Sequence, residues 1–302
     1  MNIKSLLAKP FAGVVQRQIN KDQLSAVEDQ QSILNQLVKI GKLTLFGKEH
    51  GLDQVKTYED FKKAVPIRDY EAFKPYIEQI KKGTQNVLWK GRPIYFAKTS
   101  GTTSGVKYIP ITKDSIGNHI NGARNAILSY MSKTQQTQFA GGKMIFLSGS
   151  PELERVGGIP TGRLSGGVNF EPYKAKLFET IGKPIDTIEL FPASEGFFAF
   201  QEDRNQPGLL LNTNAGIFYE FIPLAEVHHE NPTRLSLSEV QLGAQYAIII
   251  NSNAGLWGYN IGDTVKFVSI HPYRIIVTGR VKHFISAFGE HVIGEEVEQA
   301  LL

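Results

Sequence analysis

The stretch that most constrains this chain is a polar loop between two short apolar runs. Every residue from Thr99 to Gly105 is serine, threonine or glycine, and Lys107 follows closely. The flanking runs, residues 93–97 and 108–111, have the length and composition of β-strands, so the tract is predicted to be a tight loop between two strands. Glycines let backbone N–H groups approach an anion closely, and hydroxyls and a lysine add further donors. The loop therefore has the chemistry to hold the phosphates of a nucleoside triphosphate.

This loop is not the phosphate loop of the common nucleotide hydrolases. That loop has a glycine, four residues and then Gly-Lys-Ser/Thr, and Val106 stands five positions after Gly101, where the second glycine is required. Taken alone, the tract is also compatible with an exposed linker rich in serine, threonine and glycine. Another class of ATP-using protein must therefore be considered.

The composition excludes several classes of protein. The chain has 302 residues, 41% of them hydrophobic and 21% charged, which is ordinary for a globular protein. The net charge of +4 is small and spread out, and there is no cysteine for disulfides, thiolate metal sites or a nucleophile. The N-terminal residues are too broken by lysine and proline for a signal peptide, and no apolar run approaches the ~18 residues of a membrane span. We expect a soluble cytoplasmic protein with no nucleic-acid or membrane partner.

Apolar periodicity predicts helices in the first part of the chain. Residues 11–50 carry spacings of three and four, which indicate one or two amphipathic helices ending near Gly51. A short helix over residues 58–66 is predicted to stop before its proline. A further helix is predicted over residues 68–80, with Asp69 as its N-cap and a break or kink at Pro75.

The rest of the chain indicates an α/β fold. Thr112 is predicted to cap a helix that runs to about Ser132, and a buried strand over residues 143–147 follows a glycine pair. Strand, helix and strand in succession favour an α/β sheet. The later elements are predicted as a helix over 172–181, antiparallel strands over 187–191, 208–211, 217–222, 246–251, 264–269 and 273–278, and a short helix over 294–302.

Two segments in the middle of the chain have residue types suited to a nucleotide. At Gly166 and Gly167 the backbone could pass flat against a planar ring. The segment from Phe191 to Glu195 follows a predicted strand, and strand ends of α/β sheets are where ligands usually bind. Phe191 can stack on a base, and the Glu195 carboxylate can hold magnesium, which prefers oxygen ligands.

A third segment, Tyr259-Asn-Ile-Gly-Asp263, places an aspartate after a turn, and Arg280 comes soon after it. Aspartate suits the two hydroxyls of a ribose because it can accept both hydrogen bonds. Taken singly, Glu195 and Asp263 could be surface caps, and Phe191 could be a core aromatic. Their order along the chain is the informative part.

That succession resembles the adenylate-forming superfamily, which includes acyl-CoA synthetases, luciferases and peptide-synthetase adenylation domains. Within it, the pattern is most similar to the auxin-responsive family of acyl-acid–amido synthetases, in a bacterial version. Residues 99–107 match the family's ATP-phosphate loop, and residues 191–195 look like its Tyr-x-x-Ser-Glu motif. Residues 259–263 look like its Tyr-Arg-x-Gly-Asp motif, and residues 279–290 look like the segment that leads into its hinge.

The resemblance implies an α/β fold: the large N-terminal domain of the adenylate-forming fold, with mixed sheets flanked by helices and a smaller antiparallel β subdomain. Residues 1–284 would form this adenylation domain, and residues 285–302 would begin the hinge and the C-terminal domain, which is otherwise absent. The interval between the phosphate loop and Phe191 is shorter than in the family, with the join near residues 164–167. Phe191 also replaces the family's tyrosine, and Asn260 replaces its arginine.

The resemblance also implies roles for particular residues. The catalytic set would be Lys107 at the β- and γ-phosphates, Ser194 at the α-phosphate and Glu195 as the Mg²⁺ ligand. Asp263 would bind the ribose hydroxyls, and Arg280 would contact the nucleotide or act in domain rotation. The other expected nucleotide contacts are Thr99, Ser100, Gly101, Thr102, Thr103 and Gly105 at the phosphates and Gly166, Gly167, Val168 and Phe191 at the adenine.

The activity implied is that of an acid–amino acid ligase that uses ATP and Mg²⁺. A carboxylic acid would become acyl-AMP with release of pyrophosphate, and an amine such as an amino acid would then take the acyl group. Two alternatives stay open: a non-catalytic nucleotide-binding remnant, and a coenzyme A ligase of the same superfamily. The acid itself is not legible in the sequence.

Overall fold

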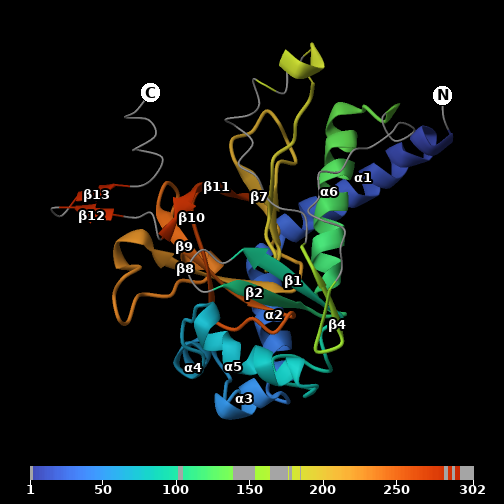
Figure 1. Cartoon of the computed structure of the whole chain (residues 1–302). Coiled ribbons are helices and arrows are strands. Elements are labelled where there is room, and N and C mark those ends of the chain that lie inside the picture. The colour runs from blue at the N-terminus through green and yellow to red at the C-terminus, as the bar shows by residue number, and fades with distance from the viewer. Residues whose placement is uncertain are drawn as a thin grey trace.

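The computed structural model describes residues 3–100, 105–138, 154–163, 176, 179–183, 185–281, 285–287 and 290–292. The strand expected over residues 143–147, the helix expected over 294–302 and most of the helix expected over 172–181 lie outside these residues. In the described part, helices flank two larger sheets, and a short two-stranded ribbon lies at the edge of the molecule (Figure 1).

The chain begins with helices α1 (Ile3–Leu24), α2 (Ala26–Gly41), α3 (Leu45–Glu49), α4 (Tyr58–Ala64) and α5 (Tyr70–Lys81). The helical region expected before Gly51 is confirmed, but it holds three helices and not one or two, and α1 begins earlier than the periodicity indicated. The start of α4 is a capping box, in which Thr57 accepts from the Asp60 amide and the Asp60 carboxylate accepts from the Thr57 amide. The expected N-cap of α5 is confirmed because the Asp69 side chain accepts from the backbone N–H of Ala72.

The break predicted at Pro75 is wrong, because α5 continues through it. Pro75 lies in the second turn, where its missing N–H removes one hydrogen bond, the one to the carbonyl of Glu71. The buried side chains of Phe73, Ile77 and Ile80 hold this helix on the core. Tertiary packing therefore outweighs the local cost of the proline.

The smaller sheet is built around the polar loop. It has the order β2-β1-β4-β3, from β1 (Tyr95–Ser100), β2 (Val106–Ile111), β3 (Glu154–Val156) and β4 (Ile159–Gly162). Strands β1 and β2 are antiparallel and pair Thr99 with Lys107, so the two strands predicted beside the polar loop are confirmed, although Thr99 and Ser100 belong to β1 and not to the loop. Strands β1 and β4 are parallel, which makes this sheet mixed.

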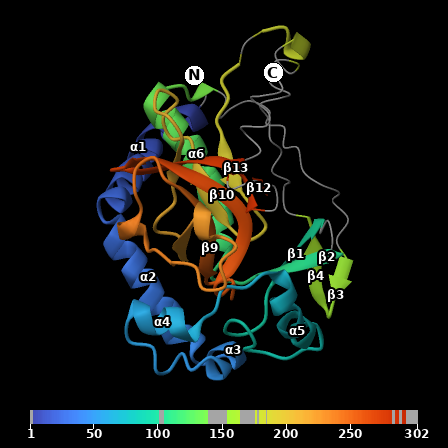
Figure 2. The ribbon, with the colours of Figure 1, turned by 90° about the vertical axis from the view of Figure 1, so that its left-hand side faces the viewer.

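Helix α6 (Ile116–Thr134) follows β2. Thr112 does not cap it directly, since the N-cap position is Ser115. Thr112 instead closes the turn before the helix: its Oγ1 accepts from the Ser115 amide at 3.0 Å, and its own amide donates to Ser115 Oγ at 2.8 Å. Helices α1 and α6 lie side by side (Figures 1 and 2).

The larger sheet has seven strands, and every neighbouring pair in it is antiparallel. Its order is β5 (Leu190–Pro192), β6 (Phe197–Phe200), β7 (Leu209–Leu211), β11 (Tyr273–Arg280), β10 (Tyr259–Ile270), β9 (Gln245–Ser252) and β8 (Ile217–Pro223). The 3₁₀ turns η2 (Leu224–Glu226) and η3 (Leu237–Glu239) and the ribbon of β12 (Ile285–Ala287) and β13 (Glu290–Val292) complete the described elements.

Two sequence expectations for this sheet need correction. The strand expected over residues 187–191 begins only at Leu190, since residues 185–189 have no regular structure. Asp263 does not follow a turn but lies inside β10, which extends back to Tyr259. The pairing of β10 with β9 is irregular between Asn260 and Thr264, and this bulge-like stretch accommodates the residues that resembled a turn.

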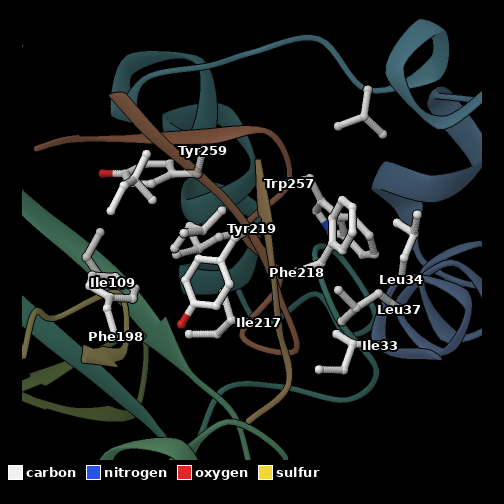
Figure 3. Packing of buried hydrophobic residues seen from close by; sticks show 14 of the residues in the cluster. Ile33, Leu34, Leu37, Ile109, Phe198, Ile217, Phe218, Tyr219, Trp257 and Tyr259 are labelled. Carbon is white, nitrogen blue, oxygen red and sulfur yellow. The ribbon is translucent and has the colours of Figure 1, made fainter. Parts of the chain in front are cut away.

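The core lies on both faces of the larger sheet. Figure 3 shows Ile217 and Tyr219 of β8 on one side, near Ile109, and Phe218 on the other side, near Leu37 of α2. This alternation follows from the two-residue period of a strand. Helix α2 runs along one side of the larger sheet and the smaller sheet lies on the opposite side (Figure 2). No helix in the described part of the chain is long and apolar enough to cross a membrane.

Candidate active site

Ser194 and Glu195 form the turn of the hairpin between β5 and β6. The amide of Ala193 donates to the carbonyl of Gly196 at 2.8 Å, and the Gly196 amide donates back to Ala193 at 3.3 Å, so the two residues between them make the whole turn. Asn118 of α6 fixes the start of β6, because its Oδ1 accepts from the backbone N–H that follows Gly196 at 2.6 Å. The backbone that carries Glu195 is therefore held on two sides.

Glu195 meets Tyr259, the first residue of β10. The Tyr259 hydroxyl donates to Oε1 of Glu195 at 3.3 Å. Tyr259 is only 1% exposed, and this burial raises the pKa of its phenol, so the group stays a neutral donor. Burial likewise raises the pKa of Glu195, while the charge of Lys107 and the hydrogen bond from Tyr259 lower it.

Lys107 lies near the start of β2, directly after the polar loop. Its ammonium group is 5.8 Å from the ring centre of Tyr70, whose hydroxyl accepts from the backbone N–H of Tyr108 at 2.8 Å. The charge of Lys107 also lowers the pKa of Glu195, so the end of the polar loop interacts electrostatically with the β5–β6 turn.

Asp263 and Arg280 face each other across β10 and β11. The carboxylate of Asp263 is 10% exposed and lies 2.9 Å from Arg280 Nε, whose side chain is 60% exposed. Burial raises the pKa of Asp263, and the Arg280 guanidinium opposes that shift. The negative charge of Asp263 in turn raises the pKa of Glu195. The two carboxylates are therefore coupled, with one lysine and one arginine beside them.

The structure thus gathers Lys107, Glu195 and Asp263, with Ser194 in the same turn and Thr99 paired to Lys107. Gly105, at the end of the loop, is exposed and has a φ of +80°, which favours glycine. Ser100 is the last residue of β1. Six other expected contacts, and the side chain of Ser100, lie outside the described residues: Gly101, Thr102, Thr103, Gly166, Gly167 and Val168.

Phe191 is part of the hydrophobic core. It is 8% exposed, and its ring centre lies 5.1 Å from that of Phe198 in an edge-to-face arrangement. This position agrees with the alternative interpretation of the sequence, in which Phe191 is a core aromatic. Stacking of Phe191 on an adenine stays a prediction.

Sequence reasoning missed the support beneath Tyr259. Arg68 forms a backbone bridge to this end of β10: its N–H donates to the Gly258 carbonyl at 2.7 Å, and its carbonyl accepts from Asn260 at 2.8 Å. Asn251 adds a third bond, since its Oδ1 accepts from the Gly258 amide at 2.6 Å. The partners are too distant in sequence for any local pattern to connect them.

The acidic groups suit a cation that is bound together with phosphates. Within the described ranges, no three histidine, cysteine, aspartate or glutamate side chains come together as a metal site. Mg²⁺ is commonly held by one or two carboxylates plus the phosphates of a substrate. The partly buried Glu195 carboxylate, with Asp263 nearby, fits that pattern better than a resident protein-only metal site.

A mixed sheet and a larger antiparallel sheet flanked by helices form the fold of the large domain of adenylate-forming enzymes. The GH3.15 acyl acid amido synthetase structure is similar with a TM-score of 0.74 and 13% identity, over 96% of this chain and 75% of that one. A 2-hydroxyisobutyryl-CoA ligase structure is similar with a TM-score of 0.56 and 13% identity, over 90% of this chain and 72% of that one. These likenesses confirm the expected fold class.

Sequence comparison then identifies the family. The GH3 family N-terminal domain matches residues 15–189, and the GH3 family central domain matches residues 210–280. The chain belongs to the GH3 family, which confirms the family expected from the motifs.

The curated relatives that match are plant synthetases. A jasmonoyl–L-amino acid synthetase of Nicotiana attenuata, JAR4, is 33% identical over 127 residues, which cover 40% of this chain and 21% of that enzyme. The probable indole-3-acetic acid-amido synthetase GH3.13 of Oryza sativa subsp. japonica is 33% identical over 101 residues, or 33% of this chain and 21% of that enzyme. The aligned part therefore spans about a fifth of these relatives.

Proposed function

We propose that this protein activates a carboxylic acid with ATP and transfers the acyl group to an amine such as an amino acid. The observation that carries the proposal is that Lys107 and Asp263, from two other segments of the chain, both act electrostatically on Glu195. Membership of the GH3 family and the amido synthetase names of the matching relatives support it.

In the proposed reaction, a carboxylate oxygen of the acid attacks the α-phosphorus of ATP. The bond from that phosphorus to the bridging oxygen breaks, and pyrophosphate leaves with the electron pair. The nitrogen lone pair of the amine then attacks the acyl carbon, AMP leaves, and the amine gives up a proton. Positioning and charge stabilisation supply most of the rate in chemistry of this kind.

The chain's own residues would hold the reactants. Lys107 would neutralise the β- and γ-phosphates, Ser194 would donate to the α-phosphate, and Glu195 would hold the Mg²⁺ that accompanies ATP. Asp263 would accept from the ribose hydroxyls, and Arg280 would contact the nucleotide or take part in domain rotation. The other contacts proposed are Thr99, Ser100, Gly101, Thr102, Thr103 and Gly105 at the phosphates, and Gly166, Gly167, Val168 and Phe191 at the adenine.

The proposal includes a domain assignment and a location. Residues 1–284 would be the adenylation domain, and residues 285–302 would begin the hinge and the C-terminal domain. The end of β11 at Arg280 and the end of the GH3 central-domain match at residue 280 support a boundary close to this point. The protein would be a cytoplasmic, bacterial member of the family, shortened between the phosphate loop and Phe191.

An ATP–pyrophosphate exchange assay with a panel of carboxylic acids, including jasmonate and indole-3-acetate, tests the proposal. We expect exchange that depends on one acid, and we expect Lys107→Ala to reduce it at least tenfold. Lys98→Ala, on the neighbouring strand, removes a lysine that is paired with Glu154 and should have little effect. Failure of the protein to bind ATP under any condition would refute the proposal.

The same assay separates the alternatives. Binding of ATP without any acyl-AMP would identify a non-catalytic nucleotide-binding protein. If acyl-AMP forms, competition between amino acids and coenzyme A for the acyl group decides between an amido synthetase and a coenzyme A ligase.

A further inference from the structure

The hydroxyl of Tyr259 donates a hydrogen bond to the Glu195 carboxylate at 3.3 Å. We propose that Tyr259 is the positioning residue of Glu195: its hydroxyl holds one carboxylate oxygen and leaves the other free for the Mg²⁺ that accompanies ATP. The Mg²⁺ part of this inference rests on the proposed function. The effect of the phenol on the carboxylate does not.

Tyr259 can position Glu195 because the backbone on both sides of Tyr259 is fixed. The backbone bridge to Arg68 holds the carbonyl before Tyr259 and the amide after it, at 2.7 Å and 2.8 Å. The amide of Gly258 donates to Asn251 Oδ1 at 2.6 Å. The side-chain amide of Asn251 in turn donates to Glu220 Oε2 at 2.8 Å, inside the core. These bonds leave little freedom for the Cα of Tyr259.

The ring is fixed as well as the backbone. Tyr259 is among the largest fully buried side chains, and its ring packs edge-to-face on Phe73 with 5.5 Å between the ring centres. A phenol with a fixed ring can vary little more than the rotation of its O–H bond. The position of the hydroxyl oxygen is therefore fixed, and it determines where the Glu195 carboxylate can accept the hydrogen bond.

Glu195 sits on a two-residue turn, and its side chain is only partly buried. The fixed hydroxyl of Tyr259, which donates to Oε1 at 3.3 Å, therefore restricts where the carboxylate lies. This bond uses one acceptor position of Oε1, and a carboxylate has about four such positions, so the group can still bind a cation.

The Tyr259→Phe variant removes the hydroxyl and keeps the ring. Tyr76→Phe is the matched control, since the Tyr76 hydroxyl donates at 2.6 Å to the carboxylate of Glu49, a glutamate that is not part of the proposed nucleotide site. Both variants are checked by thermal melting. ATP binding is then measured by calorimetry at a series of Mg²⁺ concentrations and in EDTA. We expect Tyr259→Phe to raise the Mg²⁺ concentration for half-maximal binding by about 3- to 10-fold, with no change in EDTA and no change in Tyr76→Phe.

A second measurement needs no nucleotide. The Glu195 carboxyl is titrated by NMR in protein labelled with ¹³C at the glutamate carboxyl, with Glu195→Gln to assign the signal. We expect its pKa to rise by roughly half a unit or more in Tyr259→Phe. A Glu195 titration and a Mg²⁺ requirement that are both the same in Tyr259→Phe and in the unaltered protein would overturn the proposal. If the titration shifts but the unaltered protein binds no ATP, the positioning role stands and the proposed function fails.

Discussion

Arg280 and Asp263 are direct neighbours across β11 and β10, with Arg280 Nε 2.9 Å from Asp263 Oδ1. The same carboxylate is the group proposed to accept hydrogen bonds from a ribose. Because the arginine side chain is 60% exposed, it can move aside without disturbing the core. If a nucleotide binds as proposed, its ribose and Arg280 would both draw on the Asp263 carboxylate.

Asp263→Asn is expected to weaken the binding of both ATP and AMP by about tenfold or more, since hydrogen bonds to a charged group are worth roughly 1.5–3 kcal/mol. Both nucleotides should be affected equally because both carry the ribose. Equilibrium binding by calorimetry measures the loss. Asp186→Asn is the control, because Asp186 pairs with Arg204 at 2.6 Å elsewhere on the surface. Unaltered AMP affinity in Asp263→Asn would remove Asp263 from the site.

Glu195→Gln is expected to stabilise the protein at neutral pH while lowering its activity. The folded-state pKa of Glu195 is raised above its ordinary value of 4.5, mainly by burial. A raised pKa means that the folded state binds the proton more tightly than the unfolded state. The protonated glutamate therefore stabilises the folded state fully below pH 4.5, and this stabilisation is lost as the pH rises through the folded-state pKa. The ionised carboxylate is therefore a cost at neutral pH, and the neutral amide avoids it.

Thermal melting as a function of pH checks this prediction. The variant should melt higher than the unaltered protein at pH 7.5, and the difference should disappear below about pH 4.5, where the glutamate is protonated. A lower melting temperature for Glu195→Gln at pH 7.5 would contradict it, and would mean that the carboxylate holds the fold together.

The parts of this protein that were legible in its sequence are those with local signals. Asp69 caps α5 as its position before an apolar face indicated, and the strands beside the polar loop follow from short apolar runs. The family resemblance singled out Glu195 and Asp263, which the structure brings together. What local patterns could not supply is the hydrogen bond between Tyr259 and Glu195, which joins residues 64 positions apart.

The errors have the same origin. Pro75 is a strong local signal for a helix break, yet the buried face of α5 keeps the helix continuous. The segment before Asp263 has the composition of a turn, yet pairing of Tyr259 and Asn260 with β9 and the bridge to Arg68 keep it in β10. In each case long-range contacts outweigh a local preference, and those contacts have no signature in a short window of sequence.

Arg234→Met is expected to destabilise the protein strongly. Arg234 binds both oxygens of Glu220, at 2.9 Å and 2.7 Å, and the Glu220 side chain is 0% exposed. Removing the arginine leaves a buried charge without its partner, which costs about 3–5 kcal/mol. Urea denaturation measures this loss. Lys176→Ala breaks an exposed pair with Glu179 and should leave the urea midpoint unchanged. Comparable midpoints for the two variants would contradict this account.

Gly258→Ala tests the support beneath Tyr259. Gly258 has a φ of +57°, and a Cβ there would lie 2.4 Å from the carbonyl oxygen of Pro66. The backbone has to move, and with it the bridge to Arg68 that fixes Tyr259. Gly243→Ala is the matched control, since Gly243 has a φ of +81° with no atom within 4 Å of the added Cβ. It should cost only the conformational strain, about 1 kcal/mol.

The two alanine variants are compared by urea denaturation and by ATP binding. Gly258→Ala is expected to cost at least twice as much stability as Gly243→Ala, because a clash with backbone is added to the same strain. It is also expected to raise the Mg²⁺ requirement for ATP binding in the direction expected for Tyr259→Phe, since the phenol loses its fixed position. Equal stability losses would show that the Pro66 contact relaxes freely. An unchanged Mg²⁺ requirement, despite a larger loss of stability, would separate the backbone bridge from the positioning of Glu195.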